Sequence, residues 1–198
     1  MQMTTGVRSK MFLRIILIGA ASLVLAACVG GDRFIETATA PVLLGNAESI
    51  AVLPFENRSN SEEAGAVVSD LSVTALRSYT TLAVTPEEAV GQTIDSVETP
   101  SFSERQRLPL RQIGEVLGVS YVLTGSVSEY GYQFGLREEP SVSINMRLIE
   151  VASGETVWAA SSGTVGAGVF SRDSVSIVAH RLVDRMINRM IGAEAVPQ

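Results

Sequence analysis

The sequence reads YVLTGSVSEYGY over residues 121–132 and VSINMRLIEVASGETVW over residues 142–158. Apolar and polar residues alternate along both stretches, a pattern typical of β-strands that bury one face and expose the other. The pair Ser153-Gly154 interrupts the second stretch and predicts a tight hairpin turn. Strands joined by hairpins pair antiparallel, so this region predicts the centre of a mostly antiparallel sheet.

Apolar residues at helical spacing flank this region in the sequence. An apolar run at 49–55 predicts a strand, and the segment 62–79 predicts a helix with Ser61 as its N-cap. The remaining predicted elements are a strand at 82–84 and helices that begin at Thr85, span 110–117 and span 171–191. A sheet covered by helices in this way is an α/β fold of the α+β sandwich type.

The first 27 residues predict a lipoprotein signal peptide. Three basic residues precede an uncharged, mostly apolar run at 15–27, which is shorter than the roughly 20 residues of a membrane-spanning helix. The run ends in Leu25-Ala26-Ala27-Cys28, which resembles the bacterial lipobox. That resemblance implies cleavage before Cys28 and attachment of acyl chains such as palmitate to this residue. Because Val29 rather than Asp follows, it also implies delivery to the outer membrane.

Three regions are expected after the cleavage site. Residues 28–46 are predicted to be the lipidated N-terminus and a flexible tether, because they are rich in small residues without a sustained period. Residues 47–192 are predicted to form a single α/β domain, and residues 193–198 a disordered tail. Several acyl chains on one residue anchor a protein stably. No cofactor is expected other than this covalent lipid.

The charge of the chain excludes one large class of functions. The chain has 15 Lys and Arg residues against 21 Asp and Glu residues, a formal net charge of −6. Arg8, Lys10 and Arg14 lie in the predicted signal peptide, which has no acidic residue, so 12 basic and 21 acidic residues remain, a net charge of −9. Such an acidic body argues against a nucleic-acid partner. One Cys and one His also exclude an intramolecular disulfide and an ordinary His/Cys zinc site.

No catalytic or phosphate-binding motif is recognisable in the sequence. His180 lies within the last predicted helix without a paired nucleophile. Three adjacent carboxylate pairs lie at predicted helix starts, where they complement the helix dipole, or in a hairpin loop: Glu62-Glu63, Glu87-Glu88 and Glu138-Glu139. The sequence therefore predicts a protein that is not an enzyme and that has no metal site.

A row of basic residues follows the apolar stripe of the last predicted helix. Arg181, Arg185 and Arg189 recur every four residues. Three interpretations remain open: a solvated face favourable to the helix C-terminus, a contact with anionic lipid headgroups, or a subunit interface. Trp158, the single Trp, is predicted to be a packing anchor rather than a ligand platform.

Several segments together resemble a known group of envelope lipoproteins. These segments are 50–57, 117–130 and 146–161, with Gly65, Asp70, Glu129-Tyr130-Gly131-Tyr132, Gly135-Leu136, Glu139-Pro140 and Ser171-Arg172-Asp173-Ser174. They resemble the lipoproteins related to the curli secretion channel protein CsgG and, within that group, the PelC-type lipoproteins of Pel exopolysaccharide export. The resemblance implies a small domain of the CsgG/TolB N-terminal type.

The resemblance also implies a function. It implies a non-enzymatic lipoprotein on the periplasmic side of the outer membrane, forming a homo-oligomeric ring that guides an exopolysaccharide or a curli-like polymer to an outer-membrane export channel. For the PelC type it implies an acidic lumen for a cationic polysaccharide, in agreement with the net charge of −9. The expected site residues are Cys28 for lipidation, Phe170 and Arg172 for a membrane-facing edge, and Glu129, Glu138 and Glu139 for an electronegative passage.

A second hypothesis is a monomeric activator of peptidoglycan synthases, resembling lipoproteins that activate penicillin-binding proteins from the end of a long disordered tether. A flexible tether of the length of 29–46 has a root-mean-square reach of only about 25 Å, which disfavours this hypothesis. An enzyme, as a third class, requires a pocket for which the sequence offers no residues.

Overall fold

The computed structural model describes residues 33–36, 41–42, 44, 49–96, 110–134, 138–165 and 173–192. All of them lie within one unit of the chain, Asp32–Gln198. This unit begins earlier than the predicted domain start at residue 47, because a strand at Arg33–Glu36 joins its sheet.

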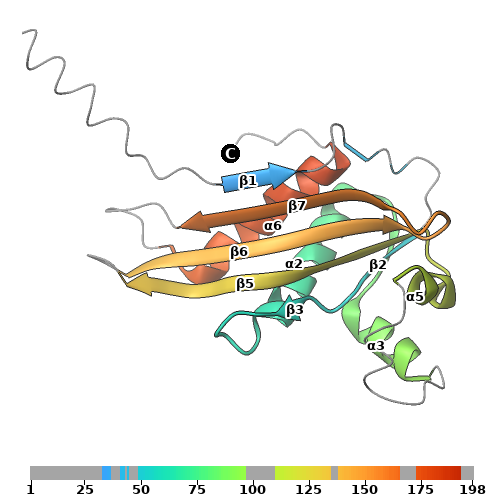
Figure 1. Ribbon diagram of the computed structural model, residues 1–198, viewed down its shortest axis with the longest axis horizontal. Coiled ribbons are helices and arrows are strands. Elements are labelled where there is room, and N and C mark those ends of the chain that lie inside the picture. The colour runs from blue at the N-terminus through green and yellow to red at the C-terminus, as the bar shows by residue number, and fades with distance from the viewer. Residues whose placement is uncertain are drawn as a thin grey trace, which may run out of the picture. The chain divides into compact units, whose positions relative to one another are not determined.

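Seven strands form one sheet in the order β1-β7-β6-β5-β2-β4, with β3 paired to β5 (Figure 1). The three long strands β5 (Tyr121–Phe134), β6 (Glu138–Glu150) and β7 (Thr156–Val165) run antiparallel to one another. β1 (Arg33–Glu36) extends this antiparallel part along β7. The predicted sheet centre is therefore confirmed.

Three short strands complete the sheet in parallel orientation. β2 (Ser49–Val52) pairs with β5 and with β4 (Ala83–Thr85), while β3 (Glu56–Asn57) pairs with β5 farther along that strand. Parallel neighbours need a crossover, and helices supply it between β2 and β4 and between β2 and β5. The predicted fold class, a mostly antiparallel sheet covered by helices, is confirmed.

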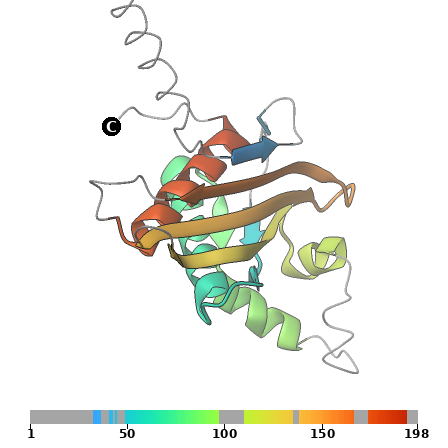
Figure 2. The same cartoon turned by 60° about the vertical axis from the view of Figure 1, so that its left-hand side comes forward.

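The helices cover the two faces of the sheet unequally. α2 (Ala64–Tyr79) and α6 (Val175–Ile191) pack together against one face (Figure 2), and α3 (Glu87–Ser96) and α5 (Leu110–Leu117) pack near β2 and the start of β5. Alternation along β5 separates two cores: Leu123 belongs to the α2/α6 core and Val122 to the α3/α5 core. The larger core contains most of the fully buried large side chains, among them Trp158, Leu76, Leu123, Ile144, Met146, Leu148, Leu182, Met186 and Met190.

The helix ends differ in how they are capped. α6 begins with Ser174 as N-cap, whose hydroxyl accepts a hydrogen bond from the backbone N–H of Ile177 at 3.3 Å. The prediction of Ser61 as N-cap of α2 is wrong, because the N-cap is Glu63 and no side chain caps it. Ser61 belongs instead to a turn that Asn57 closes: the Asn57 amide donates to the carbonyl oxygen of Ser61 at 2.6 Å.

A tyrosine on α2 is bonded to an aspartate on α6. The hydroxyl of Tyr79 donates to Oδ1 of Asp184 at 2.7 Å, and this hydrogen bond raises the pKa of Tyr79 above its ordinary value. A pKa raised in the folded state means that stabilisation is fully present below the pKa in the unfolded chain, about 10. The stabilisation is then lost as the pH rises through the pKa in the folded state.

We expect Tyr79→Phe to flatten the alkaline end of the stability profile. The variant lacks the ionising hydroxyl, so its melting temperature should fall less steeply above about pH 10 than that of the wild type. The measurement is thermal unfolding at pH 8 to 11 for both proteins. Tyr121, whose pKa is raised by burial, remains in both and sets a common background slope. Parallel profiles for the two proteins would contradict this assignment.

Candidate functional site

The strand nearest the predicted lipidation site is held by side chains from far along the chain. In β1, Oε1 of Glu36 accepts a hydrogen bond from Nε1 of Trp158 at 2.6 Å, and Oε2 lies 3.6 Å from Nη1 of Arg189. The guanidinium of Arg189 also lies 4.4 Å from the ring centroid of Phe34, a cation–π contact. β1 is therefore fixed to both the sheet and the last helix.

Residues after β1 also pack on the end of α6. The N–H of Val42 donates to the carbonyl oxygen of Met190 at 2.8 Å, and Val42 and Leu44 pack against the larger core. The prediction of a flexible tether over 28–46 is thus wrong for Arg33–Glu36 and for these two residues. The sequence signal was slight: Phe34-Ile35 is the only pair of adjacent large apolar residues between 29 and 41.

We expect Phe34→Ala to loosen β1, at a cost of about 1–2 kcal/mol in the free energy of unfolding, because it removes both the ring burial and the Arg189 contact. The matched control is Ile35→Ala: its side chain is 63% exposed, and we expect a change within about 0.5 kcal/mol. Chemical denaturation measures the stability, and hydrogen exchange of the β1 amides measures the loosening. Equal effects of the two substitutions would contradict the role of Phe34 in holding β1 to the last helix.

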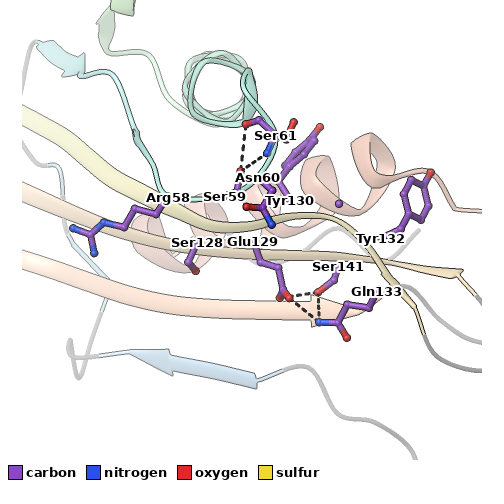
Figure 3. A pocket seen from close by; sticks show the side chains of 11 residues that line it. Arg58, Ser59, Asn60, Ser61, Ser128, Glu129, Tyr130, Tyr132, Gln133 and Ser141 are labelled. Carbon is purple, nitrogen blue, oxygen red and sulfur yellow. Dashed lines mark hydrogen bonds between the residues drawn. The ribbon is translucent and has the colours of Figure 1, made fainter.

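A polar pocket of about 430 Å³ lies beside the second half of β5 (Figure 3). The turn between β3 and α2 forms one wall and β5 the other. The lining residues are Arg58, Ser59, Asn60, Ser61, Ser128, Glu129, Tyr130, Gly131, Tyr132, Gln133 and Ser141. No pattern in the sequence indicates this pocket, because its two walls are separated by more than 60 residues.

A β-bulge determines which side chains of β5 point to which face. The pairing with β6 shifts between Val127 and Glu129, so Ser128 is an extra residue in β5. Tyr130 then packs against the larger core, whereas Glu129 and Gln133 lie on the opposite face with Ser141 of β6. The bulge thus places these polar side chains on one face of the sheet, where β5 ends and β6 begins.

Three of these polar side chains form a closed hydrogen-bonded set (Figure 3). The Gln133 amide donates to Oε1 of Glu129 at 2.7 Å and to Oγ of Ser141 at 3.2 Å, and the Ser141 hydroxyl donates to Oε2 of Glu129 at 2.8 Å. Ser141 is buried beneath the other two. The set presents a carboxylate with fixed orientation, which suits binding of hydrogen-bond donors or cations.

The three predicted acidic site residues lie at the same end of the β5–β6 hairpin. In the pairing of β5 with β6, Glu139 lies opposite Gln133 and Glu138 lies opposite Phe134. Glu129 lies opposite Ser143, farther from the end of the hairpin. Strand alternation puts Glu139 on the face of Glu129 and Ser141, and Glu138 on the other face. The structure therefore brings Glu129 and Glu139 to one face, and their role in a passage remains a prediction.

A fourth acid close to the pocket is neutralised within the chain. Nη2 of Arg58 donates to Oε2 of Glu56 at 2.7 Å; this hydrogen bond lowers the pKa of Glu56 and raises that of Arg58. Both side chains are 61% exposed, so solvent screens the pair. Arg58 extends away from Glu129 in Figure 3, which leaves the Glu129 carboxylate to its neutral partners.

The pocket walls offer binding groups rather than a recognisable catalytic set. The described residues that line the pocket include no His, Cys or Lys, and Glu129 is the only carboxylate among these described residues. Within the described ranges, no group of three His, Cys, Asp or Glu side chains could hold a metal ion. His180 is exposed on α6 and is not among the residues that line the pocket. None of the helices in the described part of the chain is both long and apolar enough to cross a membrane.

The row of arginines on α6 takes part in contacts within the chain. Arg181 forms an ion pair with Asp173 at 2.8 Å, and Arg189 contacts Glu36 and Phe34 of β1. Arg185 is also engaged in an interaction. The row is therefore not simply a solvated face, because at least Arg189 ties the last helix to the first strand.

Other predicted features lie outside the described residues. They are the signal peptide at 1–27, the lipidation site Cys28, the membrane-edge residues Phe170 and Arg172, and the tail at 193–198. Their roles remain predictions. Trp158 is a packing anchor as predicted, with 1% of its surface exposed.

Solved structures with the same fold include two PelC dodecamers from Paraburkholderia phytofirmans. One is 22% identical with a TM-score of 0.58, covering 81% of this chain and 98% of that chain; the other is 23% identical with a TM-score of 0.60, covering 80% and 98%. A lipoprotein from Neisseria meningitidis is 21% identical with a TM-score of 0.53, covering 74% of this chain and 99% of that chain. At these identities the likeness shows the fold alone, and the PelC-type fold is confirmed.

No curated protein sequence matches this chain. Residues 44–162, however, match the profile of the family described as peptidoglycan-synthase activator LpoB. The matched range runs from the segment after β1 through β2, the pocket walls and most of β7. Because it spans more than half of the sequence, the chain belongs to the LpoB family of peptidoglycan-synthase activators.

Proposed function

We propose that this protein is a non-enzymatic lipoprotein, lipidated on Cys28 and held on the periplasmic side of the outer membrane. There it forms a homo-oligomeric ring that guides an exported polymer, such as a cationic exopolysaccharide, to an outer-membrane channel. The observation that carries this proposal is the position of β1, which begins at Arg33 and is fixed to β7 and α6.

The short stretch of chain between the proposed lipid and the domain supports this function. Four residues lie between Cys28 and Arg33. The five Cα–Cα steps from Cys28 to Arg33 span at most about 18 Å when fully extended. A domain anchored through Cys28 therefore stays at the membrane surface. A ring at the entrance of a membrane channel requires this position, whereas an activator that reaches a synthase beyond the peptidoglycan requires a long tether.

Two further observations support the proposal. The PelC structures that share this fold are dodecamers, and this chain covers 98% of their length. Glu129 and Glu139 lie on one face at the end of the β5–β6 hairpin, and Glu138 is next to Glu139 in sequence. In a ring of acidic subunits such residues would concentrate a polycation, an effect that weakens as salt increases. We assign Phe170 and Arg172 to the membrane-facing edge.

The family match favours a second candidate function, activation of a peptidoglycan synthase. In that case the domain would act as a monomer on a protein partner. The two functions make opposite demands on the segment between Cys28 and β1, which allows one experiment to separate them.

The experiment inserts about 40 flexible Gly and Ser residues between Gly31 and Asp32, which leaves β1 intact and adds a root-mean-square reach of about 35 Å. The strain carrying the insertion replaces the wild type, and both secreted polymer and peptidoglycan synthesis are measured. The matched control carries the same insertion in the tail, after Ala195. We expect polymer export to fall at least tenfold with the first insertion and to remain with the second.

Two outcomes would contradict the export function. One is full export with the long tether, and the other is a loss of peptidoglycan synthesis on deletion of the gene while export is unaffected.

Anchoring to the membrane and assembly of the ring are measured separately. Cys28→Ala should move the protein out of the membrane fraction, and light scattering of the detergent-solubilised protein should give a multi-subunit mass. A strict monomer would overturn the ring.

A further inference from the structure

The second half of β5 has a free edge. On the side of β5 away from β6, β2 pairs with Tyr121–Leu123 and β3 with Ser126 and Val127. Among the described residues, no strand continues this pairing along 128–134. We call the stretch Ser128–Phe134 the free edge. It has neither Lys nor Pro, two residues that commonly protect edge strands from pairing with another chain.

Main-chain groups of two tyrosines point out of this edge. The carbonyl oxygens of Leu123 and Val127 accept hydrogen bonds from Leu53 and Arg58, so odd-numbered residues face β2 and β3 before the bulge. The extra residue Ser128 inverts the alternation. After the bulge, Tyr130 and Tyr132 direct their N–H and C=O groups to the free edge, and Gly131 directs its own to β6.

The sequence of the free edge is nearly the same in both directions. It reads Glu-Tyr-Gly-Tyr-Gln over 129–133, with Gly131 at the centre. The packing of this chain does not explain that glycine, because its φ is not positive and a Cβ there would meet no atom within 4 Å. A glycine inside a strand is unfavourable by itself and often marks a place where another backbone approaches.

We propose that the free edge pairs antiparallel with the free edge of a second copy of this chain, about a two-fold axis through Gly131. Tyr130 then faces Tyr132 of the second copy in a hydrogen-bonded pair, twice by symmetry, which satisfies the outward main-chain groups. Glu129 faces Gln133 of the second copy. These two side chains already bond each other within one copy, so the same donor and acceptor are complementary across the axis.

The pocket supplies space for this contact. It lies along Glu129–Gln133, between β5 and the turn at Arg58–Ser61 (Figure 3), and a strand added to β5 enters there. The contact is small, so it is weak between free molecules and stronger when a shared membrane concentrates the copies. It is a second, symmetric contact and does not depend on whether the protein forms the proposed ring.

The first test is disulfide cross-linking in the full chain with Cys28→Ser, which removes its only thiol. Because this variant also lacks the lipid that would concentrate the copies, the reaction is run at high protein concentration. Gly131→Cys places two identical residues opposite each other in a non-hydrogen-bonded pair, within reach of a disulfide. The control, Ile35→Cys, is a well-exposed position on the opposite edge strand. We expect covalent dimers of Gly131→Cys to form at least tenfold faster than those of Ile35→Cys. Equal rates would overturn the proposal.

The double variant Ile35→Cys/Gly131→Cys tests a head-to-tail alternative, in which β1 of one copy adds to β5 of the next. If the double variant formed cross-linked species larger than a dimer while neither single variant formed a dimer, the head-to-tail contact would replace the symmetric one.

A third measurement uses charge. We expect Gly131→Lys and Gly131→Glu each to abolish association, and their mixture to restore it, with unchanged melting temperatures because the position is open. Association that persists in both variants would also overturn the proposal.

Discussion

Replacing Trp158 by alanine is expected to lower the free energy of unfolding by about 3–5 kcal/mol, and hence the melting temperature by about 6–20 °C. Trp158 is 1% exposed and belongs to the core between β7 and α6. Its removal leaves a cavity and also leaves Glu36 without the Nε1 donor at 2.6 Å. Both losses loosen β1, the strand nearest the predicted anchor.

The measurement for Trp158 is denaturant unfolding followed by far-ultraviolet circular dichroism, because the substitution removes the only tryptophan fluorophore. Trp158→Phe separates the two contributions. It keeps an aromatic ring in the core and loses the hydrogen bond, so we expect a cost of about 1–2 kcal/mol. A cost for Trp158→Ala below that of Trp158→Phe would show that the core closes around the missing ring.

The second large effect is expected at Gly125, where alanine should destabilise the fold by about 3 kcal/mol. A Cβ at this position would run into the main-chain carbonyl of Asn145 and lie 2.5 and 2.8 Å from two ring carbons of Phe55. The carbonyl belongs to β6 and cannot retreat without weakening the β5–β6 pairing. Phe55 is itself buried in the larger core, so it has little room to move.

Gly131→Ala is the matched control for Gly125→Ala, because both glycines lie in β5 and neither has a positive φ. A Cβ at Gly131 meets nothing within 4 Å, so its stability should change by less than about 0.5 kcal/mol. Thermal and denaturant unfolding of the two variants give the comparison. Similar costs at both positions would mean that the strand requires glycine for backbone reasons rather than for packing.

Much of this fold is predictable because the relevant signals are local. Alternation over 121–132 and 142–158 gives the three long strands, and Gly154, at φ +75°, gives the turn between β6 and β7. Helical spacing gives α2 and α6 within a few residues of their observed bounds. These patterns reflect which face of each element is buried, and that information lies within a dozen neighbouring residues.

The candidate site was only partly predictable. The sequence predicts Glu129, Glu138 and Glu139 as acids of an electronegative passage. Their division between two faces depends on the bulge at Ser128, which the alternation of the sequence does not reveal. The pocket required the turn at Arg58–Ser61 to lie against β5. β3, with two residues, is too short for any periodic signal.

The antiparallel centre of the sheet, the covering helices, the acidic charge and the lipobox-like Leu25–Cys28 segment follow from residue patterns alone. That Arg33–Glu36 is a strand and that β5 extends beyond its neighbours became evident only in the folded chain. The reason is physical: β1 is held by partners such as Trp158, which lies 122 residues from Glu36 in the chain. A segment that gains its order from such distant contacts has no periodicity of its own, so its sequence is indistinguishable from that of a tether.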